Sequence, residues 1–332
     1  SLDIAERRLP QDGRIKMSWR GREVDLRIAT MPHLHGEGAV LRILDRSSVT
    51  LDLDRLGFSQ PLVEDLRKML REPHGIFLVT GPTGSGKTTT LYAGLREIAT
   101  PDRNIITVED PIEYQLAGVN QIQINRRIGL DFASSLRAVL RQDPDIIMVG
   151  EIRDGETAAI ANQAALTGHL VLATIHTNTA AASLPRLVDM GVEPYLLAST
   201  LRGAMAQRLV RRLCPHCSEP AGLSDTVIAH FGEKSGLTAD QTDLLRRGAR
   251  RPVGCQSCGG SGYRSRVAVA DMMTMTDDIR HLLLQGAGEM QFQEIVEQSG
   301  GPTLRADAMA KVARGETSLD EAAHASPIDG AP

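Results

Sequence analysis

A glycine-rich octapeptide constrains the fold of this chain more than any other feature. Residues 81–88 read G-P-T-G-S-G-K-T and match the pattern G-x-x-x-x-G-K-[ST]. The apolar run 75–80 before them predicts a short buried strand, and 87–98 predict a helix. Glycines let backbone N–H groups surround a phosphate, and the helix N-terminus adds partial positive charge. The segment therefore predicts a phosphate-binding loop rather than a simple glycine turn.

This loop predicts binding of ATP with Mg²⁺. Lys87 would reach the outer phosphates, and the Thr88 hydroxyl would complete the shell of the metal ion. The predicted nucleotide-binding residues are Gly81, Pro82, Thr83, Gly84, Ser85, Gly86, Lys87, Thr88 and Thr89.

Acidic residues follow two further apolar runs. Glu151 comes after 146–149 and is the candidate ligand of Mg²⁺ or of the attacking water. Glu109 ends the run 105–108 and is the candidate general base. Without the loop, a helix cap at Glu151 or Asp154 and a turn at Asp110-Pro111 would be the favoured interpretations. His176 follows 170–175 on the same side and is a candidate γ-phosphate sensor, whereas His169 is expected to be structural.

Short apolar strands alternate with helical segments between residues 75 and 205. Strands are predicted at 75–80, 104–108, 146–149 and 169–175, and helices at 61–70, 87–98, 132–141, 155–167 and 180–190. This order predicts an α/β fold whose parallel sheet is covered on both faces. The predicted domains are 1–52, a small α+β unit with strands at 24–28 and 40–44; 53–210, the core; 211–264, a cysteine-bearing insert; and 265–332, a helical tail.

The formal net charge of -4 gives no general attraction to nucleic acid, and only 3% of the residues are aromatic. No apolar run approaches the roughly 18 residues of a membrane span, and no signal peptide is visible. All four cysteines lie in two C-x-x-C pairs, Cys214/Cys217 and Cys255/Cys258. Two such pairs suit a tetrahedral, structural Zn²⁺ site better than two unrelated reduced pairs.

Two arginines, Arg27 and Arg42, stand in neighbouring alternating strands of the N-terminal unit. A lone strand arginine usually faces water. The core, however, offers no obvious arginine to stabilise the charge of phosphoryl transfer, so these two are candidates.

Together these motifs resemble the type II secretion system assembly ATPases, also called the general secretion pathway protein E family, within the type II/IV secretion ATPase superfamily. The resemblance rests on Thr80–Thr90, on T-V-E-D-P-I-E at 107–113, on G-E-I-R-D at 150–154 and on T-G-H-L-V-L-A-T-I-H-T-N at 167–178. The cysteine pairs and G-R-E-V-D-L-R at 21–27 fit as well. It covers nearly the whole chain, except that the family's first N-terminal domain is not expected in it.

The resemblance implies a RecA-like core with a PAS-like N-terminal domain, a zinc insert and a helical tail. It also implies that Arg27 and Arg42 meet the γ-phosphate, with Glu109 as general base and Glu151 as the Walker B acid. The expected protein is a homo-hexameric ATPase that drives pseudopilus assembly. Its expected partners are an inner-membrane platform protein and the cytoplasmic domain of a membrane-anchored recruiting protein, and its expected place is the cytoplasmic face of the bacterial inner membrane.

Four alternatives remain. A type IV pilus extension ATPase shares every catalytic motif and often the cysteines. A retraction ATPase is disfavoured, because that branch lacks the tetracysteine insert. A nucleic-acid translocase is disfavoured by the acidic charge balance, and a catalytically silent scaffold by the intact Lys87, Thr88, Glu109 and Glu151.

Overall fold

The computed structural model describes residues 2–19, 22–45, 51–235, 237–298 and 303–325. The chain divides into two compact units, Ser1–Thr50 and Leu51–Pro332, and each is described by itself. The final residues 326–332, expected to fray, lie outside the described part.

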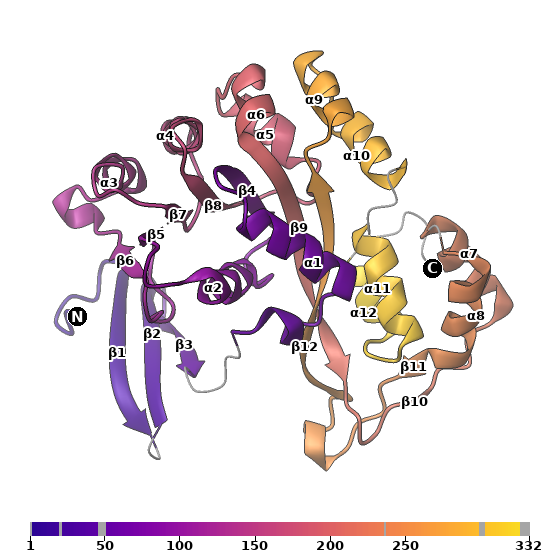
Figure 1. Ribbon diagram of the computed structural model, residues 1–332. Helices are drawn as coiled ribbons and strands as arrows, with labels where there is room; N and C mark the ends of the chain where they lie inside the picture. The colour runs from indigo at the N-terminus through magenta and orange to yellow at the C-terminus, as the bar shows by residue number, and fades with distance from the viewer. Residues whose placement is uncertain (1, 20–21, 46–50, 236, 299–302, 326–332) are drawn as a thin grey trace. The chain divides into compact units, whose positions relative to one another are not determined.

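The first unit is a three-stranded antiparallel sheet in the order β1-β2-β3 (Figure 1). The strands are β1 (Gln11–Trp19), β2 (Arg22–His33) and β3 (Gly36–Asp45). Strands β2 and β3 contain the two predicted runs, whereas β1 was not predicted. An α+β fold was expected for this unit. Its described residues form three strands and no helix.

The second unit is built on a seven-stranded sheet in the order β12-β9-β4-β8-β7-β5-β6. All neighbours pair in parallel except β12, which runs antiparallel to β9 at one edge. The strands are β4 (Gly75–Thr80), β5 (Ile105–Glu109), β6 (Asn120–Gln123), β7 (Ile146–Val149), β8 (Leu170–Ile175), β9 (Leu201–Leu213) and β12 (Tyr263–Thr274).

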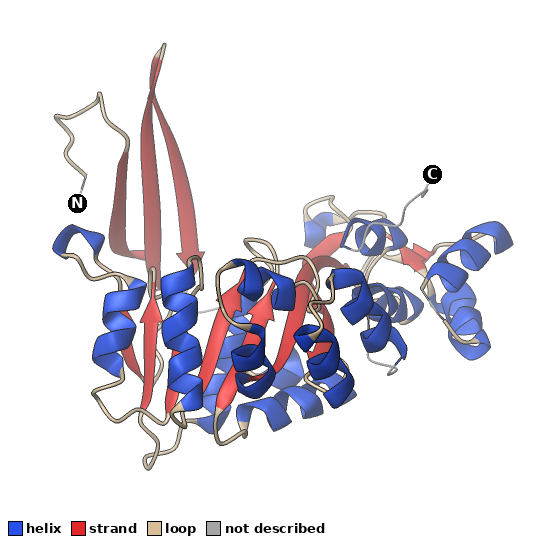
Figure 2. Ribbon diagram, turned by 90° about the horizontal axis from the view of Figure 1, so that it is seen from above, coloured by secondary structure: helices blue, strands red, loops and turns tan. Residues whose placement is uncertain are grey.

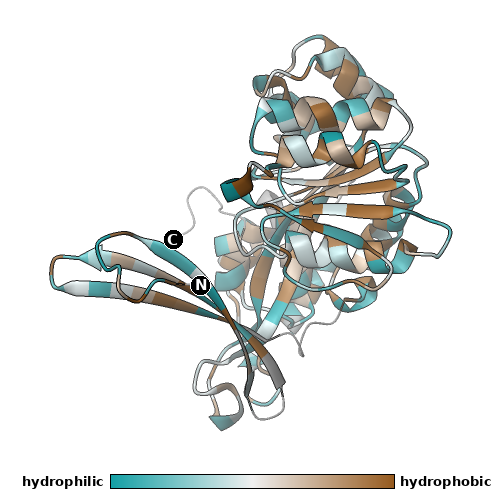
Figure 3. Cartoon of the chain, turned by 90° about the vertical axis from the view of Figure 1, so that its left-hand side faces the viewer, coloured by the Kyte–Doolittle hydropathy of each residue, from teal (hydrophilic) through white to brown (hydrophobic). Residues whose placement is uncertain are grey.

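Helices cover both faces of this sheet (Figure 2). Strand residues alternate between two cores: Phe77 and Val79 pack with α1 and α2, whereas Ile76 and Leu78 pack toward α3 and α4 on the other face. Figure 3 shows the resulting apolar strands between helices of mixed polarity. The helices of this core are α1 (Gln60–Leu70), α2 (Lys87–Ile98), α3 (Phe132–Val139), α4 (Gly155–Leu166), α5 (Ser183–Asp189) and α6 (Pro194–Thr200).

The chain after β9 forms two helical groups. The insert between the cysteine pairs holds α7 (Asp225–Lys234) and α8 (Ala239–Gly248), with the two-residue strands β10 (Glu219–Pro220) and β11 (Arg250–Arg251). The C-terminal helices are α9 (Asp277–Leu284), α10 (Glu289–Gln298), α11 (Leu304–Ala313) and α12 (Leu319–Ala325). Within the described ranges, no helix combines the length and apolarity needed to cross a membrane.

The predicted α/β core is confirmed, but one assignment was wrong. A helical tail was expected from residue 265, whereas β12 continues to Thr274 and the helices begin at Asp277. The run Val267–Met273 is buried throughout, so it carries no alternation of polarity. Alanine and methionine favour helices intrinsically, and pairing with β9 overrides that preference.

Candidate functional site

The glycines of the predicted loop adopt backbone conformations that side chains would oppose. Gly81, Gly84 and Gly86 have φ of 142°, 82° and 92°. A Cβ atom at Gly81 would lie 2.4 Å from the carbonyl oxygen of Gln207. The loop can therefore turn back tightly over the end of β4 only with glycine at this position.

Lys87 begins α2 and folds back over the loop. Its Nζ donates to the carbonyl oxygens of Gly81 at 2.7 Å and Pro82 at 3.1 Å. Burial lowers the pKa of Lys87, and the neighbouring charge of Glu151 opposes this shift. The ammonium thus lies inside the curve of the loop, where the outer phosphates of a nucleotide would be held.

Gln207, on β9, forms two hydrogen bonds to the phosphate loop and the helix that follows it. Its side-chain amide donates to the Ser85 carbonyl oxygen at 2.8 Å and accepts from the Thr90 hydroxyl at 2.8 Å. The Ser85 hydroxyl is buried and has no hydrogen-bond partner among the described residues. An unpaired buried hydroxyl beside a glycine cradle fits a site that receives polar ligand atoms.

Glu151 lies just beyond the end of β7, next to the loop after β8. One carboxylate oxygen lies 2.8 Å from Nε2 of His176, and the other lies 2.6 Å from the guanidinium of Arg153. The backbone N–H of Ile152 donates to the Thr174 carbonyl at 2.8 Å, which ties the two strand ends together. Glu151 and His176 are thereby brought into one group, as their positions after neighbouring strands predict.

Glu109, the last residue of β5, is more enclosed than the sequence suggested. Only 2% of its surface is exposed. One oxygen accepts from the Thr107 hydroxyl at 2.6 Å and from the Gln121 amide at 3.1 Å, and the other accepts from the Tyr92 hydroxyl. Burial raises the pKa of Tyr92, and the charge of Glu109 adds to this effect. The phenol therefore stays protonated as a donor to the carboxylate.

His169 lies at the opposite end of β8. Its Nδ1 contacts the carbonyl oxygen of Ala164 at 2.9 Å and the hydroxyl of Thr167 at 3.1 Å. It closes the C-terminal end of α4, in agreement with the structural role expected for it.

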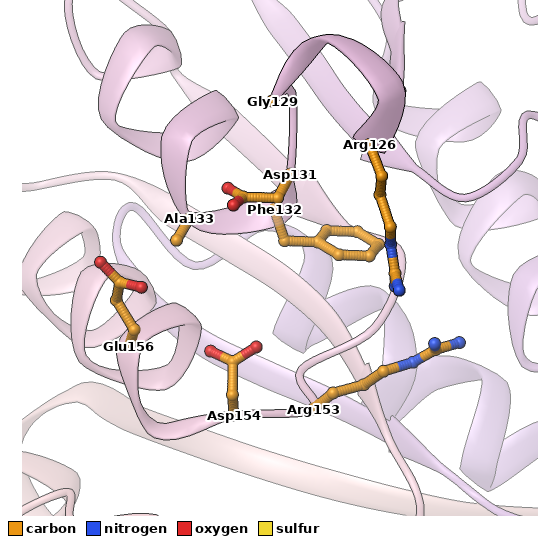
Figure 4. Close-up of a pocket in the computed structure, with 8 residues that line it drawn as sticks. All are labelled: Arg126, Gly129, Asp131, Phe132, Ala133, Arg153, Asp154 and Glu156. Carbon is orange, nitrogen blue, oxygen red and sulfur yellow. The ribbon is translucent and has the colours of Figure 1, made fainter.

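A cavity of about 390 Å³ opens where α3 and α4 begin (Figure 4). Arg126 and Arg153 extend on one side of it, and the carboxylates of Asp131, Asp154 and Glu156 lie on the other. Asp131 and Asp154 accept backbone N–H groups of their own helices, so these helix ends already have carboxylate partners. The cavity adjoins Glu151 through Arg153 but contains no residue of the phosphate loop.

The four cysteines meet at one point. All four Sγ atoms lie within 4.8 Å of one another, and Cys214–Cys255, Cys217–Cys258 and Cys255–Cys258 are 3.9, 3.9 and 3.8 Å apart. Four thiolates at 2.3 Å around a tetrahedral Zn²⁺ would be about 3.8 Å apart, whereas a disulfide requires about 2.05 Å. Backbone N–H groups of Cys255 and Gly262 point at Cys258 and lower the pKa of its thiol to about 6. This donor set suits a closed thiolate metal centre.

In the first unit, the sheet register aligns the candidate arginines. Arg27 pairs directly with Arg42 across β2 and β3, and Arg14 of β1 pairs with Arg27. Directly opposite residues point to the same face, so three guanidinium groups share one face. Asp25, also on β2, forms an ion pair with Arg14 at 3.1 Å. Arg14 was not predicted, because its strand was not recognised.

Two groups of polar residues at the core site were also missed from the sequence. Tyr92 and Gln121 bind Glu109, and Gln207 and Arg208 lie against the phosphate loop. A signal exists for the second group, since Gln207-Arg208 interrupts an apolar run. That signal has meaning only once β9 is known to pass beside β4.

Comparisons with known proteins show the family of this chain. A sequence model described as "Type II/IV secretion system protein" matches residues 1–324. The chain belongs to the type II/IV secretion system protein family. The chain is 49% identical over 320 residues to the type II secretion system ATPase E of Vibrio cholerae, covering 96% of this chain and 62% of that protein.

A second relative comes from a pilus system. The type IV pilus assembly ATPase PilB of Thermus thermophilus is 47% identical over 322 residues, covering 96% of this chain and 35% of that protein. Among solved structures, the pilus retraction motor PilT with bound ADP superposes with a TM-score of 0.67 at 28% identity, covering 96% of this chain and 78% of that one. The chain therefore has the RecA-like secretion ATPase fold, and it spans less than two thirds of the curated relatives it matches.

Proposed function

We propose that this chain is the ATP-hydrolysing part of a type II secretion motor, which powers pseudopilus assembly and protein export. The observation that carries the proposal is the position of Lys87. Its ammonium is held against the Gly81 and Pro82 carbonyls, with Glu151 nearby as the opposing charge. A cation fixed inside a glycine loop is the arrangement that nucleoside triphosphate chemistry requires.

In this mechanism, residues 81–89 bind the triphosphate through backbone N–H groups and Lys87. Thr88 and Glu151 would hold Mg²⁺, which neutralises charge on the outer phosphates when bound. His176 fixes one oxygen of Glu151, so the carboxylate keeps its orientation. Arg27 and Arg42 would supply further positive charge from the N-terminal unit, in keeping with their shared sheet face.

Two acids compete for the task of orienting the attacking water. Glu109 was the first candidate, yet three side-chain donors occupy both of its oxygens. To serve as general base it would have to lose the Tyr92 or Gln121 contact. Both oxygens of Glu151 are also in ion pairs, with His176 and Arg153, but 17% of its side chain is exposed, whereas Glu109 is only 2% exposed. We therefore assign water positioning to Glu151 first and retain Glu109 as the base only in a rearranged state.

The same family membership supports a larger assembly. We propose a homo-hexamer on the cytoplasmic face of the inner membrane. It would act with an inner-membrane platform protein and with the cytoplasmic domain of a membrane-anchored recruiting protein. In addition, Zn²⁺ would be held by Cys214, Cys217, Cys255 and Cys258 as a structural ion, because all four ligand positions are filled by the protein.

The test is ATP turnover by the purified protein, measured as released phosphate. Lys87→Ala and Glu151→Gln should each lower kcat by at least about 100-fold. Glu109→Gln should cost less if Glu151 orients the water. The matched control is Lys68→Ala, an exposed lysine of α1 that pairs with Asp65. Wild-type turnover that survives Lys87→Ala would refute the proposal.

Pilus extension is the second candidate, and the 47% identity to PilB favours it specifically. Genes for pseudopilins and secretion platform proteins beside this one would support secretion. Genes for type IV pilins there would support pilus extension.

A further inference from the structure

Arg208 occupies a position beside the phosphate loop that no motif assigns. Strand β9 pairs in parallel with β4, and Ala206 lies opposite Thr80, the last residue of β4. Arg208 is therefore two residues beyond the end of β4, level with the start of the loop. Since Gln207 points to the face of α2, Arg208 points to the opposite face. Its Nη1 would lie 3.1 Å from a Cβ atom at Gly81.

Within the described ranges, the hydrogen bonds of the Arg208 side chain go to neutral groups. Its guanidinium donates to the backbone carbonyl of Gln207 at 3.0 Å and to that of Asn178 at 2.8 Å. Asn178 follows β8, so Arg208 spans from β9 past the end of β4 to the next strand's loop. Among the residues that the structure describes, no carboxylate forms an ion pair with Arg208.

Two cations are thus concentrated around Gly81. Burial lowers the pKa of Arg208, and the more distant Asp271 opposes this shift only in part. Burial also lowers the pKa of Lys87; the charge of Glu151 opposes this shift, and Arg208 adds to it by repulsion. Partly buried charges are normally compensated by a partner. An anion with several charges, bound between Lys87 and Arg208, would remove the repulsion and supply the missing partner.

We propose that Arg208 binds the terminal phosphate of ATP from within the same chain. The inference rests on the proposed nucleotide function and extends it. Lys87 reaches the outer phosphates from one side of the loop. Arg208 approaches Gly81 from the side of Asn178, two residues after His176, which itself contacts Glu151. Arg208 therefore distinguishes a nucleoside triphosphate from a diphosphate, because a diphosphate lacks the group it would bind.

The test is equilibrium binding of fluorescent ATP and ADP analogues to the full chain with Mg²⁺. We expect Arg208→Ala to raise the Kd for the triphosphate by about 10-fold or more, as loss of a charge-assisted hydrogen bond would. The Kd for the diphosphate should change less than about 3-fold on the same reasoning. Arg208→Lys keeps the charge without the forked geometry and should lie between. Arg212→Ala, an exposed arginine of the same strand, is the matched control and should bind as wild type does.

The outcomes separate the two proposals. A selective loss of triphosphate affinity in Arg208→Ala, with the intermediate effect in Arg208→Lys, supports the inference. Unchanged triphosphate affinity, or equal loss of both nucleotides, overturns it and leaves the ATPase proposal standing. If Arg208→Ala does not fold, Arg208→Lys decides by the same selectivity. A wild-type protein that binds neither nucleotide overturns the nucleotide function itself, and the inference falls with it.

Discussion

A buried ion pair in the C-terminal helices allows one stability prediction to be worked out in detail. Lys311 of α11 is fully buried, and its Nζ lies 2.7 and 2.8 Å from the two carboxylate oxygens of Asp307, one turn earlier. One of these oxygens also accepts the backbone N–H of Ala270 on β12 at 3.0 Å. The pair therefore joins the helix to the edge strand of the sheet.

The perturbation is Lys311→Met, which keeps an apolar chain of similar length and removes the charge. Asp307 would then remain buried with a single backbone donor, and loss of one partner of a buried pair costs about 3–5 kcal/mol in unfolding free energy. The double variant Asp307→Asn/Lys311→Met has no buried charge, and its asparagine still accepts from Ala270. We expect it to recover about half of that loss or more, since replacing both partners is often nearly neutral.

The assay is urea unfolding followed by circular dichroism at 222 nm. All described helices lie in the second unit, so this signal reports its stability. The single tryptophan of the chain, Trp19, lies in the first unit, and its fluorescence reports that unit separately. Lys68→Met, at an exposed lysine, controls for the substitution itself. A cost below about 1 kcal/mol for Lys311→Met, or a double variant no more stable than the single one, would refute the reasoning.

Two further predictions concern pH and metal. Burial raises the pKa of Asp271 to about 7, so the native state keeps a proton that the unfolded chain releases near pH 4. The contribution of this proton to the free energy of unfolding is fully present at low pH. It is lost as the pH rises from about 4 to about 7, which lowers the free energy of unfolding by up to about 4 kcal/mol. Asp271→Asn should remove this pH dependence of the free energy of unfolding. If wild type and variant differed by the same free energy at pH 5 and at pH 8, the prediction would be wrong. Removing the metal from the four cysteines with a chelator should lower the thermal unfolding midpoint by roughly 5–10 °C. The midpoint of Cys214→Ser should change little when the chelator is added. Equal midpoints of the wild-type protein with and without metal would exclude a structural ion.

The sequence predicted local features of the core site well because each was encoded within a few residues. The loop glycines, Lys87 and the acids after β5 and β7 are readable from short apolar runs and the residues that follow them. The cysteine pairs were predicted for the same reason, although their convergence depends on a 37-residue gap that the chain closes with two helices, α7 and α8.

The missed features depend on which strands become neighbours. Gln207 and Arg208 are adjacent to the loop only because β9 pairs with β4, and no local pattern contains that pairing. The enclosure of Glu109 arises similarly, from a tyrosine on α2 and a glutamine on β6. Strand β12 was missed because burial on both faces removes the alternation that marks a strand.

Strand β9 runs from the phosphate loop to the cysteine cluster. It is a single 13-residue strand, hydrogen-bonded to β4 along its first half and to β12 along most of its length. The Gln207 side chain donates a hydrogen bond to Ser85 of the phosphate loop. Cys214 directly follows the end of β9 and is seven residues, or about 23 Å, from Gln207 along the strand. One continuous strand therefore connects the phosphate loop to the thiolate cluster. If β9 rotated as a rigid body by about 10° about Gln207, Cys214 would move by about 4 Å over that length.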